Sequence, residues 1–278
     1  MNDVRKTQYF LTGKSGTIGK YMSSYGHATH FDITKESEVV KWFQSQDVKN
    51  RLFLHLAAIV GESKVSQDLE YAKKVNVEGA VSVAKMALES EMRGFVFVST
   101  SHVYKPKSEK ISEDAEIEPQ NHYANLKREA EEKIVEIFKN SSTELIILRV
   151  FSVLDFYTDE FTLGGRVTKA IERSQKITIA NSLDKRDFLT PKSVAQAIEF
   201  CIEENLEGGI YNLCSGQSQT VRDAVQRMLV KASLSKDWLN FDENYSISPA
   251  VCGSNSKVIN ALPGLKPLLK WQLSEFRG

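Results

Sequence analysis

The chain has 278 residues, of which 41% are hydrophobic and 26% charged, and its 36 basic and 36 acidic residues give a formal net charge of zero. This balance is typical of a globular protein with one large domain or a domain with a small lobe, and it argues against broad electrostatic capture of nucleic acid or an anionic membrane. Three cysteines without CxxC spacing (Cys201, Cys214 and Cys252) predict neither a disulfide framework nor a metal site.

Neither a membrane-spanning segment nor a signal peptide is expected from the sequence. No apolar run approaches the roughly 18–20 residues that a membrane-spanning helix needs. The segment before the first glycine contains no apolar stretch of signal-peptide length. We therefore expect a cytoplasmic protein with no membrane partner and no nucleic-acid partner.

Short apolar runs alternate with helical patterns over the first 150 residues. This alternation is typical of βαβ units, whose right-handed crossovers build a parallel sheet. The fold class is therefore α/β, with a Rossmann-type doubly wound parallel sheet. The predicted strands are 9–13, 51–58, 94–100 and 144–150, and the predicted helices are 35–46 (with Thr34 as its N-cap), 68–91 and 124–139.

After Val150 the alternation weakens. Helical patterns cover 166–175 and 193–204, a short strand is expected near 208–216, and the tail is interrupted by proline and glycine. We predict a dinucleotide-binding domain at 1–150 and a smaller C-terminal substrate-binding lobe at 151–278, with segments of the lobe able to return to the main sheet.

The segment TGKSGTIGK places Gly13, Gly16 and Gly19 in GxxGxxG spacing, directly after a predicted strand and before a helical run. Glycines let backbone N–H groups approach a pyrophosphate, and a helix N-terminus adds a favourable dipole. A tight turn without a ligand is the alternative. The strand and helix context favours dinucleotide binding.

The acidic residue that usually meets the adenosine ribose lies about 20 positions after the first glycine. Asp32 lies 19 positions after Gly13, but the segment between Gly19 and Phe31 has little room for a helix and a strand. Asp32 could instead belong to the following strand and lie near the adenine. Lys14 could reach a 2′-phosphate, which favours NADP over NAD, or it could be a solvated turn residue.

The segment HYANLKREAEE contains Tyr123 four positions before Lys127, so both side chains lie on one face of a helix. A phenol must lose about 3 pKa units, or roughly 4 kcal/mol, to act as a base near neutral pH. A neighbouring ammonium acts in that direction because it stabilises the phenolate. Thr100 ends a predicted strand and can polarise a carbonyl. The rest of the segment, REAEE at 128–132, is predicted to be the solvated face of the helix.

These motifs occur in an order that resembles the extended short-chain dehydrogenase/reductase family, in its NAD-dependent epimerase/dehydratase group acting on nucleotide sugars. The segments that carry the resemblance reach to about residue 225. They are TGKSGTIG, FDIT, LHLAAIVGES, YAKKVNVEGA, FVSTSHVY, HYANLK, ILRVFSVLD, KRDFLTPKSVAQAI and YNLCSGQSQTVRDAV.

The resemblance implies a role for each matching residue. Catalysis falls to Thr100, Tyr123 and Lys127, and contacts with a nucleotide-sugar substrate fall to Ser101, His102 and Arg186. It also implies a homodimer formed through the helices at 68–90 and 123–139. The resemblance places Gly13, Gly16 and Gly19 at the pyrophosphate of NAD or NADP, Asp32 and Ile33 at the adenine, and Ala57 and Ala58 beside the nicotinamide-side ribose, with Asn76 supporting the site. The other expected cofactor contacts are Lys14, Ser15, Thr17, Ile18, Leu56, Ser99, Tyr123 and Lys127.

Members of the family differ after the active-site threonine, where 4,6-dehydratases carry an Asp-Glu pair and this chain has Ser101 and His102. Elimination of water then lacks its acid and base, which leaves a 4-epimerase or a 4-keto-sugar reductase. The short segment between Gly19 and Asp32, the compact C-terminal lobe and Lys14 resemble the keto-sugar reductases, so we expect a 4-keto-sugar reductase or epimerase-reductase. The alternative is a 4-epimerase that retains NAD, which the segment LHLAAIVGES resembles. A cofactor-binding redox sensor or scaffold is a further alternative, although such relatives commonly lose the tyrosine or the lysine.

Overall fold

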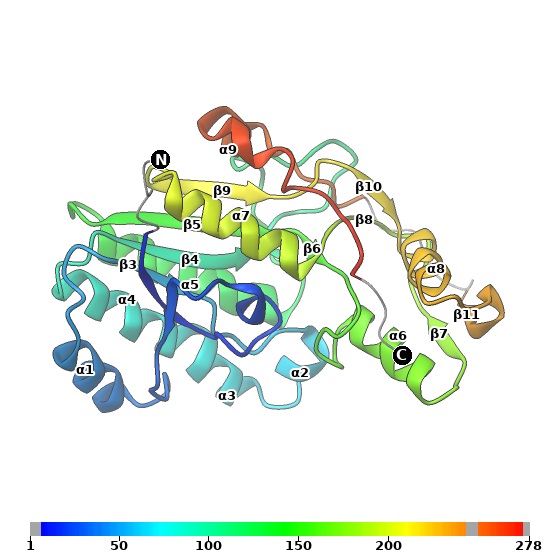
Figure 1. Cartoon of the computed structure of the whole chain (residues 1–278), viewed down its shortest axis with the longest axis horizontal. Coiled ribbons are helices and arrows are strands. Elements are labelled where there is room, and N and C mark those ends of the chain that lie inside the picture. Colours follow the sequence, from blue (N-terminus) through cyan, green and yellow to red (C-terminus); the bar gives the residue numbers. More distant parts are fainter. Residues whose placement is uncertain (1–6, 243–249, 275–278) are drawn as a thin grey trace.

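The computed structural model describes residues 7–242 and 250–274. A six-stranded parallel sheet forms its centre, with strand order β2-β1-β3-β4-β5-β9 (Figure 1). This order confirms the doubly wound α/β class. The strands are β1 (Tyr9–Thr12), β2 (Gly26–Ala28), β3 (Leu52–His55), β4 (Gly94–Thr100), β5 (Glu144–Val150) and β9 (Gly209–Leu213).

Helices cover both faces of this sheet because the central strands are apolar on both faces. Phe95 and Phe97 of β4 pack against the helices of one layer, whereas Val96 packs against the other layer. The first layer contains α1 (Glu36–Ser45), α3 (Leu69–Lys73), the π-helical segment η2 (Lys74–Gly79), α4 (Ala80–Glu89) and α5 (His122–Phe138). The second contains α7 (Pro191–Glu203) and α9 (Ser256–Ala261), followed by the 3₁₀ turn η5 (Pro263–Leu265).

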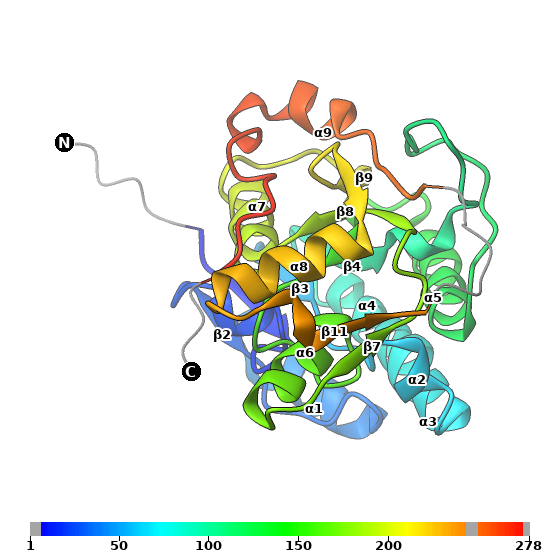
Figure 2. The same ribbon diagram turned by 90° about the vertical axis from the view of Figure 1, so that its right-hand side faces the viewer.

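A smaller layer lies beyond the carboxyl ends of the main strands (Figure 1) and faces the viewer in Figure 2. It has its own apolar cluster, in which Phe156, Val167 and Met228 are fully buried. The predicted lobe at 151–278 is thus discontinuous, because α7, β9 and α9 return to the main sheet. The layer contains β6 (Ser152–Val153), α6 (Leu163–Glu172), β7 (Ile177–Ile179), β8 (Lys185–Leu189), β10 (Ser218–Thr220), α8 (Val221–Lys231), η4 (Lys236–Trp238) and β11 (Leu239–Phe241).

The predicted strands at 9–13, 51–58, 94–100 and 144–150 are confirmed, as are the long helices. The helix expected after the glycine loop is wrong, because the chain there forms only the 3₁₀ turn η1 (Gly19–Tyr21) before β2. Thr34 is not the N-cap of α1, since the helix begins after Lys35 without a side-chain cap. Thr34 instead donates both its N–H and its hydroxyl to Asp32.

Within residues 7–242 and 250–274, none of the helices has the length and apolar character needed to cross a membrane. The same residues contain no group of three or more histidine, cysteine or acidic side chains arranged to hold a metal ion. The predicted absence of a signal peptide concerns in part residues 1–6, which lie outside the described residues.

Candidate active site

A cavity of about 710 Å³ lies between the carboxyl ends of the central strands and the smaller layer. Open α/β sheets bind their ligands at this edge, and a cavity of this size can enclose a large organic ligand. The sequence-predicted residues that line it are Gly13, Ser15, Gly16, Thr17, Ile18, Gly19, Leu56, Ala57, Ala58, Ser99, Thr100, His102, Tyr123, Lys127 and Arg186.

The glycine loop forms one wall of the cavity. Gly13 has φ +73°, and a Cβ on it would lie 2.7 Å from the backbone nitrogen of Ala57. A side chain here would therefore be strained and would collide with main chain. Gly13 and the residues from Ser15 to Gly19 line the cavity, and a phosphate cradle is built from the backbone of such a loop.

Lys14 does not line the cavity. Its Nζ donates to the carbonyl oxygens of Met22 at 2.7 Å and Ser23 at 2.8 Å. In this structure the ammonium thus binds carbonyls that the short turn η1 leaves at its end, and its assignment to a 2′-phosphate stays a prediction.

Asp32 and Ile33 also lie away from this cavity. Asp32 is in the turn after β2, not in a strand, and its carboxylate accepts from Thr34. Ile33 packs against Gly79 and lines a separate cavity of about 310 Å³. Their assignment to the adenine stays a prediction.

The loop after β3 lines the cavity beside the glycine loop and is held from two sides. Ala57 donates its N–H to the Thr12 hydroxyl at 3.2 Å. The buried Asn76 side chain accepts from the N–H of Ile59 at 2.7 Å and donates to its carbonyl at 2.9 Å. Asn76 thus supports the cavity without lining it.

Thr100, Tyr123 and Lys127, the residues that the sequence analysis assigned to catalysis, all line this cavity. Thr100 is the last residue of β4, and its hydroxyl accepts the N–H of His102 at 3.3 Å. The Asn121 side chain caps α5 by accepting the N–H of Ala124 at 2.8 Å, so Tyr123 lies in the first turn. Lys127 is 2% exposed, and its Nζ lies 3.9 Å from the Phe97 ring centroid.

Burial shifts the pKa values of both members of this pair away from those expected in water. It raises the pKa of the Tyr123 phenol above its usual value, so the phenol keeps its proton at neutral pH. Burial lowers the pKa of Lys127 to about 7, an effect that the negative charge of Glu131 opposes. The protein alone therefore holds Tyr123 in the proton-donating form.

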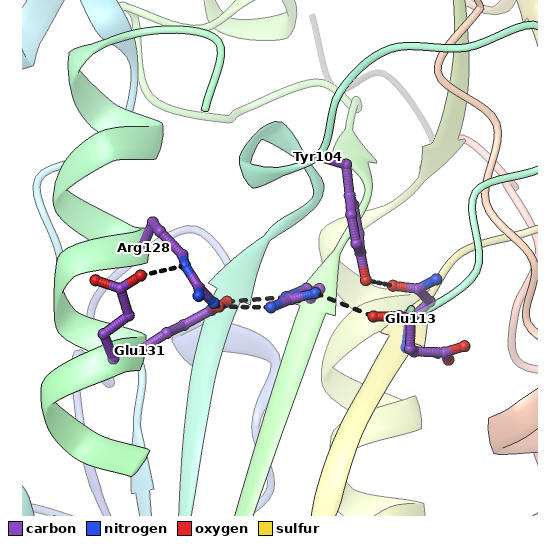
Figure 3. A network of polar contacts seen from close by, with 7 residues as sticks. Tyr104, Glu113, Arg128 and Glu131 are labelled. Atoms are coloured by element: carbon purple, nitrogen blue, oxygen red, sulfur yellow. Dashed lines mark hydrogen bonds and ion pairs between the residues drawn. The ribbon is translucent and has the colours of Figure 1, made fainter. Parts of the chain in front are cut away.

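A buried ion pair lies one turn further along α5 (Figure 3). Arg149 of β5 donates from Nε and Nη2 to the two carboxylate oxygens of Glu131, at 3.0 and 2.7 Å. Arg149 also lies over the Tyr104 ring, 4.7 Å from its centroid. The predicted solvated face at 128–132 is thus wrong for Glu131, which is fully buried.

On the substrate side, Arg186 lines the cavity and its Nη2 lies 2.8 Å from the Asp184 carboxylate. His102 is beside it, and burial together with the charge of Arg186 lowers its pKa to about 4. Ser101 does not line the cavity, and its buried hydroxyl has no hydrogen-bond partner among the described residues. Its assignment to the substrate stays a prediction.

Three polar residues at the cavity mouth were missed by the sequence reasoning. Lys64 and Asp159 line the cavity and form an ion pair at 3.2 Å. Glu62 accepts the N–H of Tyr123 at 3.1 Å. Nothing in the local sequence indicates that Glu62 contacts Tyr123, 61 positions away. The same holds for the contact of Lys64 with Asp159, 95 positions away.

Comparisons with known proteins agree with this geometry. The model of the NAD dependent epimerase/dehydratase family matches residues 12–214. GDP-6-deoxy-D-mannose reductase of Pseudomonas aeruginosa is 24% identical over 78% of this chain and 77% of its own length. dTDP-D-glucose 4,6-dehydratase of Bos taurus is 22% identical over 87% and 69%. A solved structure of RMD from Pseudomonas aeruginosa with NADPH has a TM-score of 0.81 at 19% identity, and the match covers 95% of this chain and 98% of that one.

Proposed function

The chain belongs to the NAD dependent epimerase/dehydratase family and is an NAD(P)-dependent nucleotide-sugar-modifying enzyme of the short-chain dehydrogenase/reductase type, and we propose that it reduces the 4-keto group of a nucleotide-diphosphate sugar. The observation that carries this proposal is the cavity in which a glycine cradle, Thr100, a protonated Tyr123 and Lys127 share one space.

The residues present fit a dinucleotide. Ser15 to Gly19 would hold its pyrophosphate through backbone N–H groups, and Leu56 to Ala58 would hold its nicotinamide half. When bound in its reduced form, the cofactor supplies the hydride. We give NADP a weak preference because the reductase structure that this fold resembles was solved with NADPH. Lys14 would support that preference if its ammonium left the carbonyls of Met22 and Ser23 when the cofactor binds.

The proton chemistry follows from the side chains. The neutral Tyr123 phenol would donate its proton to the carbonyl oxygen of the sugar, and the Thr100 hydroxyl would polarise the same oxygen. Lys127, with its pKa lowered to about 7, can carry a positive charge that stabilises the phenolate left behind. Arg186 and His102 would contact the nucleotide-sugar substrate.

The same cavity supports a reductase over a dehydratase. Elimination of water from a sugar needs an acid and a base near the reacting carbon. Among the described residues that line the cavity, Asp159 is the one carboxylate, and it is paired with Lys64. The residues after Thr100 are Ser101 and His102, and the latter is neutral at pH 7 because its pKa is about 4.

Net cofactor consumption tests the proposal. The purified protein should oxidise NADPH or NADH stoichiometrically with a nucleotide-linked 4-keto-6-deoxy sugar. Interconversion of a UDP-hexose at C4 without net cofactor consumption would replace the reductase by the 4-epimerase. Cofactor binding without turnover of any nucleotide sugar would support a redox sensor or scaffold.

The proposal extends to the division of the chain into two parts and to its assembly. We propose that residues 1–150 form the dinucleotide-binding part and that the smaller layer within 151–278 binds the sugar nucleotide. We also propose a cytoplasmic homodimer that pairs through the helical surfaces at 68–90 and 123–139. Exposed apolar side chains at Leu69 and Val135 on these helices support that interface.

A further inference from the structure

A four-residue helix, α2 (Glu62–Val65), lies at the cavity mouth between the loop after β3 and the first turn of α5. Its Glu62 carboxylate accepts from the N–H of Tyr123 at 3.1 Å and pairs with Nδ1 of His122 at 2.6 Å. A carboxylate at a helix N-terminus is favoured by unpaired N–H groups and by the helix dipole. Glu62 thus binds the backbone of the proposed acid itself.

Apolar packing joins the same two segments. Val65 is fully buried in a cluster with Leu126 of α5, and Ile59 and Tyr123 pack against that cluster. The short helix and the first turn of α5 therefore share both a polar contact and a packed contact. A displacement of α2 would therefore move the Tyr123 side chain, because tightly packed side chains transmit strain.

The next residue with a charge on α2 reaches the opposite side of the cavity. Lys64 forms its ion pair with Asp159 and lies over the ring of Phe161, 5.5 Å from its centroid. Asp159 and Phe161 belong to the segment between β6 and α6 in the smaller layer. Both Lys64 and Asp159 line the cavity, so a ligand there meets this ion pair directly.

We propose that Glu62 is a positioning residue for Tyr123, and that α2 transmits occupation of the smaller layer, through the Lys64–Asp159 pair, to the first turn of the catalytic helix. This inference rests on the proposed function for the role of Tyr123. A nucleotide-sugar diphosphate near Lys64 would compete with Asp159 for the ammonium, and α2 would shift with it. The reaction would then be best aligned when the substrate is bound.

The test uses Glu62→Gln, Asp159→Asn and the double variant, with Glu70→Gln as the matched control. Glu70 lies on the neighbouring helix α3, is exposed and does not line the cavity. We expect Glu62→Gln to lower kcat by about tenfold or more while the cofactor Kd stays within about twofold. The double variant should have a kcat close to that of the slower single variant, because both changes break the same linkage.

A second readout does not depend on turnover. Hydrogen–deuterium exchange at residues 121–127 should be faster in Glu62→Gln than in wild type or Glu70→Gln. Saturating UDP, GDP or dTDP should alter this exchange in wild type and alter it less in both single variants. Wild-type exchange and wild-type kcat in Glu62→Gln, or effects of the two changes on kcat that multiply independently, would overturn the inference. Absence of turnover in wild type would refute the proposed function alone, since the exchange comparison still decides the role of Glu62.

Discussion

Arg149 and Glu131 form a bidentate ion pair, and neither residue is more than 1% exposed. The pair fixes α5 to β5 one turn beyond Lys127 (Figure 3). Arg149 also donates to the Glu113 carbonyl at 3.5 Å, and Tyr104 donates to Asn212 at 2.8 Å. The helix that carries Tyr123 and Lys127 is therefore anchored to the sheet by charge as well as by packing.

The first prediction concerns this pair. Glu131→Gln should destabilise the fold by about 3–5 kcal/mol, because it leaves the Arg149 charge buried without its partner. Chemical denaturation measures the free energy of unfolding. The double variant Glu131→Leu/Arg149→Met should recover most of that loss, because no uncompensated charge remains.

An exposed pair on the same helix provides the control. Lys133 and Glu129 lie 2.7 Å apart but are 50% and 34% exposed. Glu129→Gln should therefore change the unfolding free energy by less than about 1 kcal/mol. A loss of the same size in Glu129→Gln and Glu131→Gln would contradict the role we give to burial.

The second prediction uses the lowered pKa of Lys127. Its pKa is about 7 in the folded protein, against an ordinary value of 10.5 for a solvated lysine, so the unfolded chain binds more protons between these values. Stability from this group is therefore lowest below pH 7 and rises as the pH increases towards 10.5. Lys127→Met should abolish turnover yet stabilise the cofactor-free protein by a few kcal/mol at pH 7, with a gain that shrinks at higher pH.

Thermal unfolding between about pH 6 and pH 9.5, a range that brackets most of this titration, measures the gain, with the exposed Lys133→Met as control. The control should show no pH-dependent gain. If the Lys127→Met protein were less stable than wild type at the acidic end of this range, burial of the charged lysine would not destabilise the fold.

The third prediction concerns the proposed acid. Tyr123→Phe should lower turnover by about 10²–10⁴-fold, because the phenol that donates the proton is removed. The cofactor Kd should change little, since the aromatic ring remains. Steady-state rates and a cofactor titration check this, with the part-exposed Tyr25→Phe as control. Full activity in Tyr123→Phe would exclude it as the acid.

The sequence predicted those features whose signals are local. Periodicity located the strands that end at Thr12 and Thr100, and the spacing of Tyr123 and Lys127 put both on one helical face. These features depend on neighbours within a few residues. The carboxyl ends of the strands lie at one edge because the sheet is parallel, so a shared position for Thr100, Tyr123 and Lys127 could be predicted as well.

The errors arise where a side chain finds a distant partner. Glu131 lies in a run of charges that resembles a solvated face, and its pairing with the distant Arg149 accounts for its burial. The segment after the glycine loop lost its expected helix because tertiary contacts stabilise a shorter path there. Glu199 of α7 accepts from the Ser23 N–H at 2.6 Å and from the Tyr9 hydroxyl at 2.7 Å.

The last prediction separates two roles for Lys14. Its ammonium binds the carbonyls of Met22 and Ser23, so Lys14→Met should weaken the glycine loop itself. Affinities for NADPH and NADH should then fall by the same factor, and stability should fall by about 1–3 kcal/mol because two carbonyl acceptors lose a charged donor. Isothermal titration with both cofactors measures the ratio of the two dissociation constants. A loss of affinity confined to NADPH would instead place Lys14 at the 2′-phosphate, and the contacts with Met22 and Ser23 would then have to break when the cofactor binds.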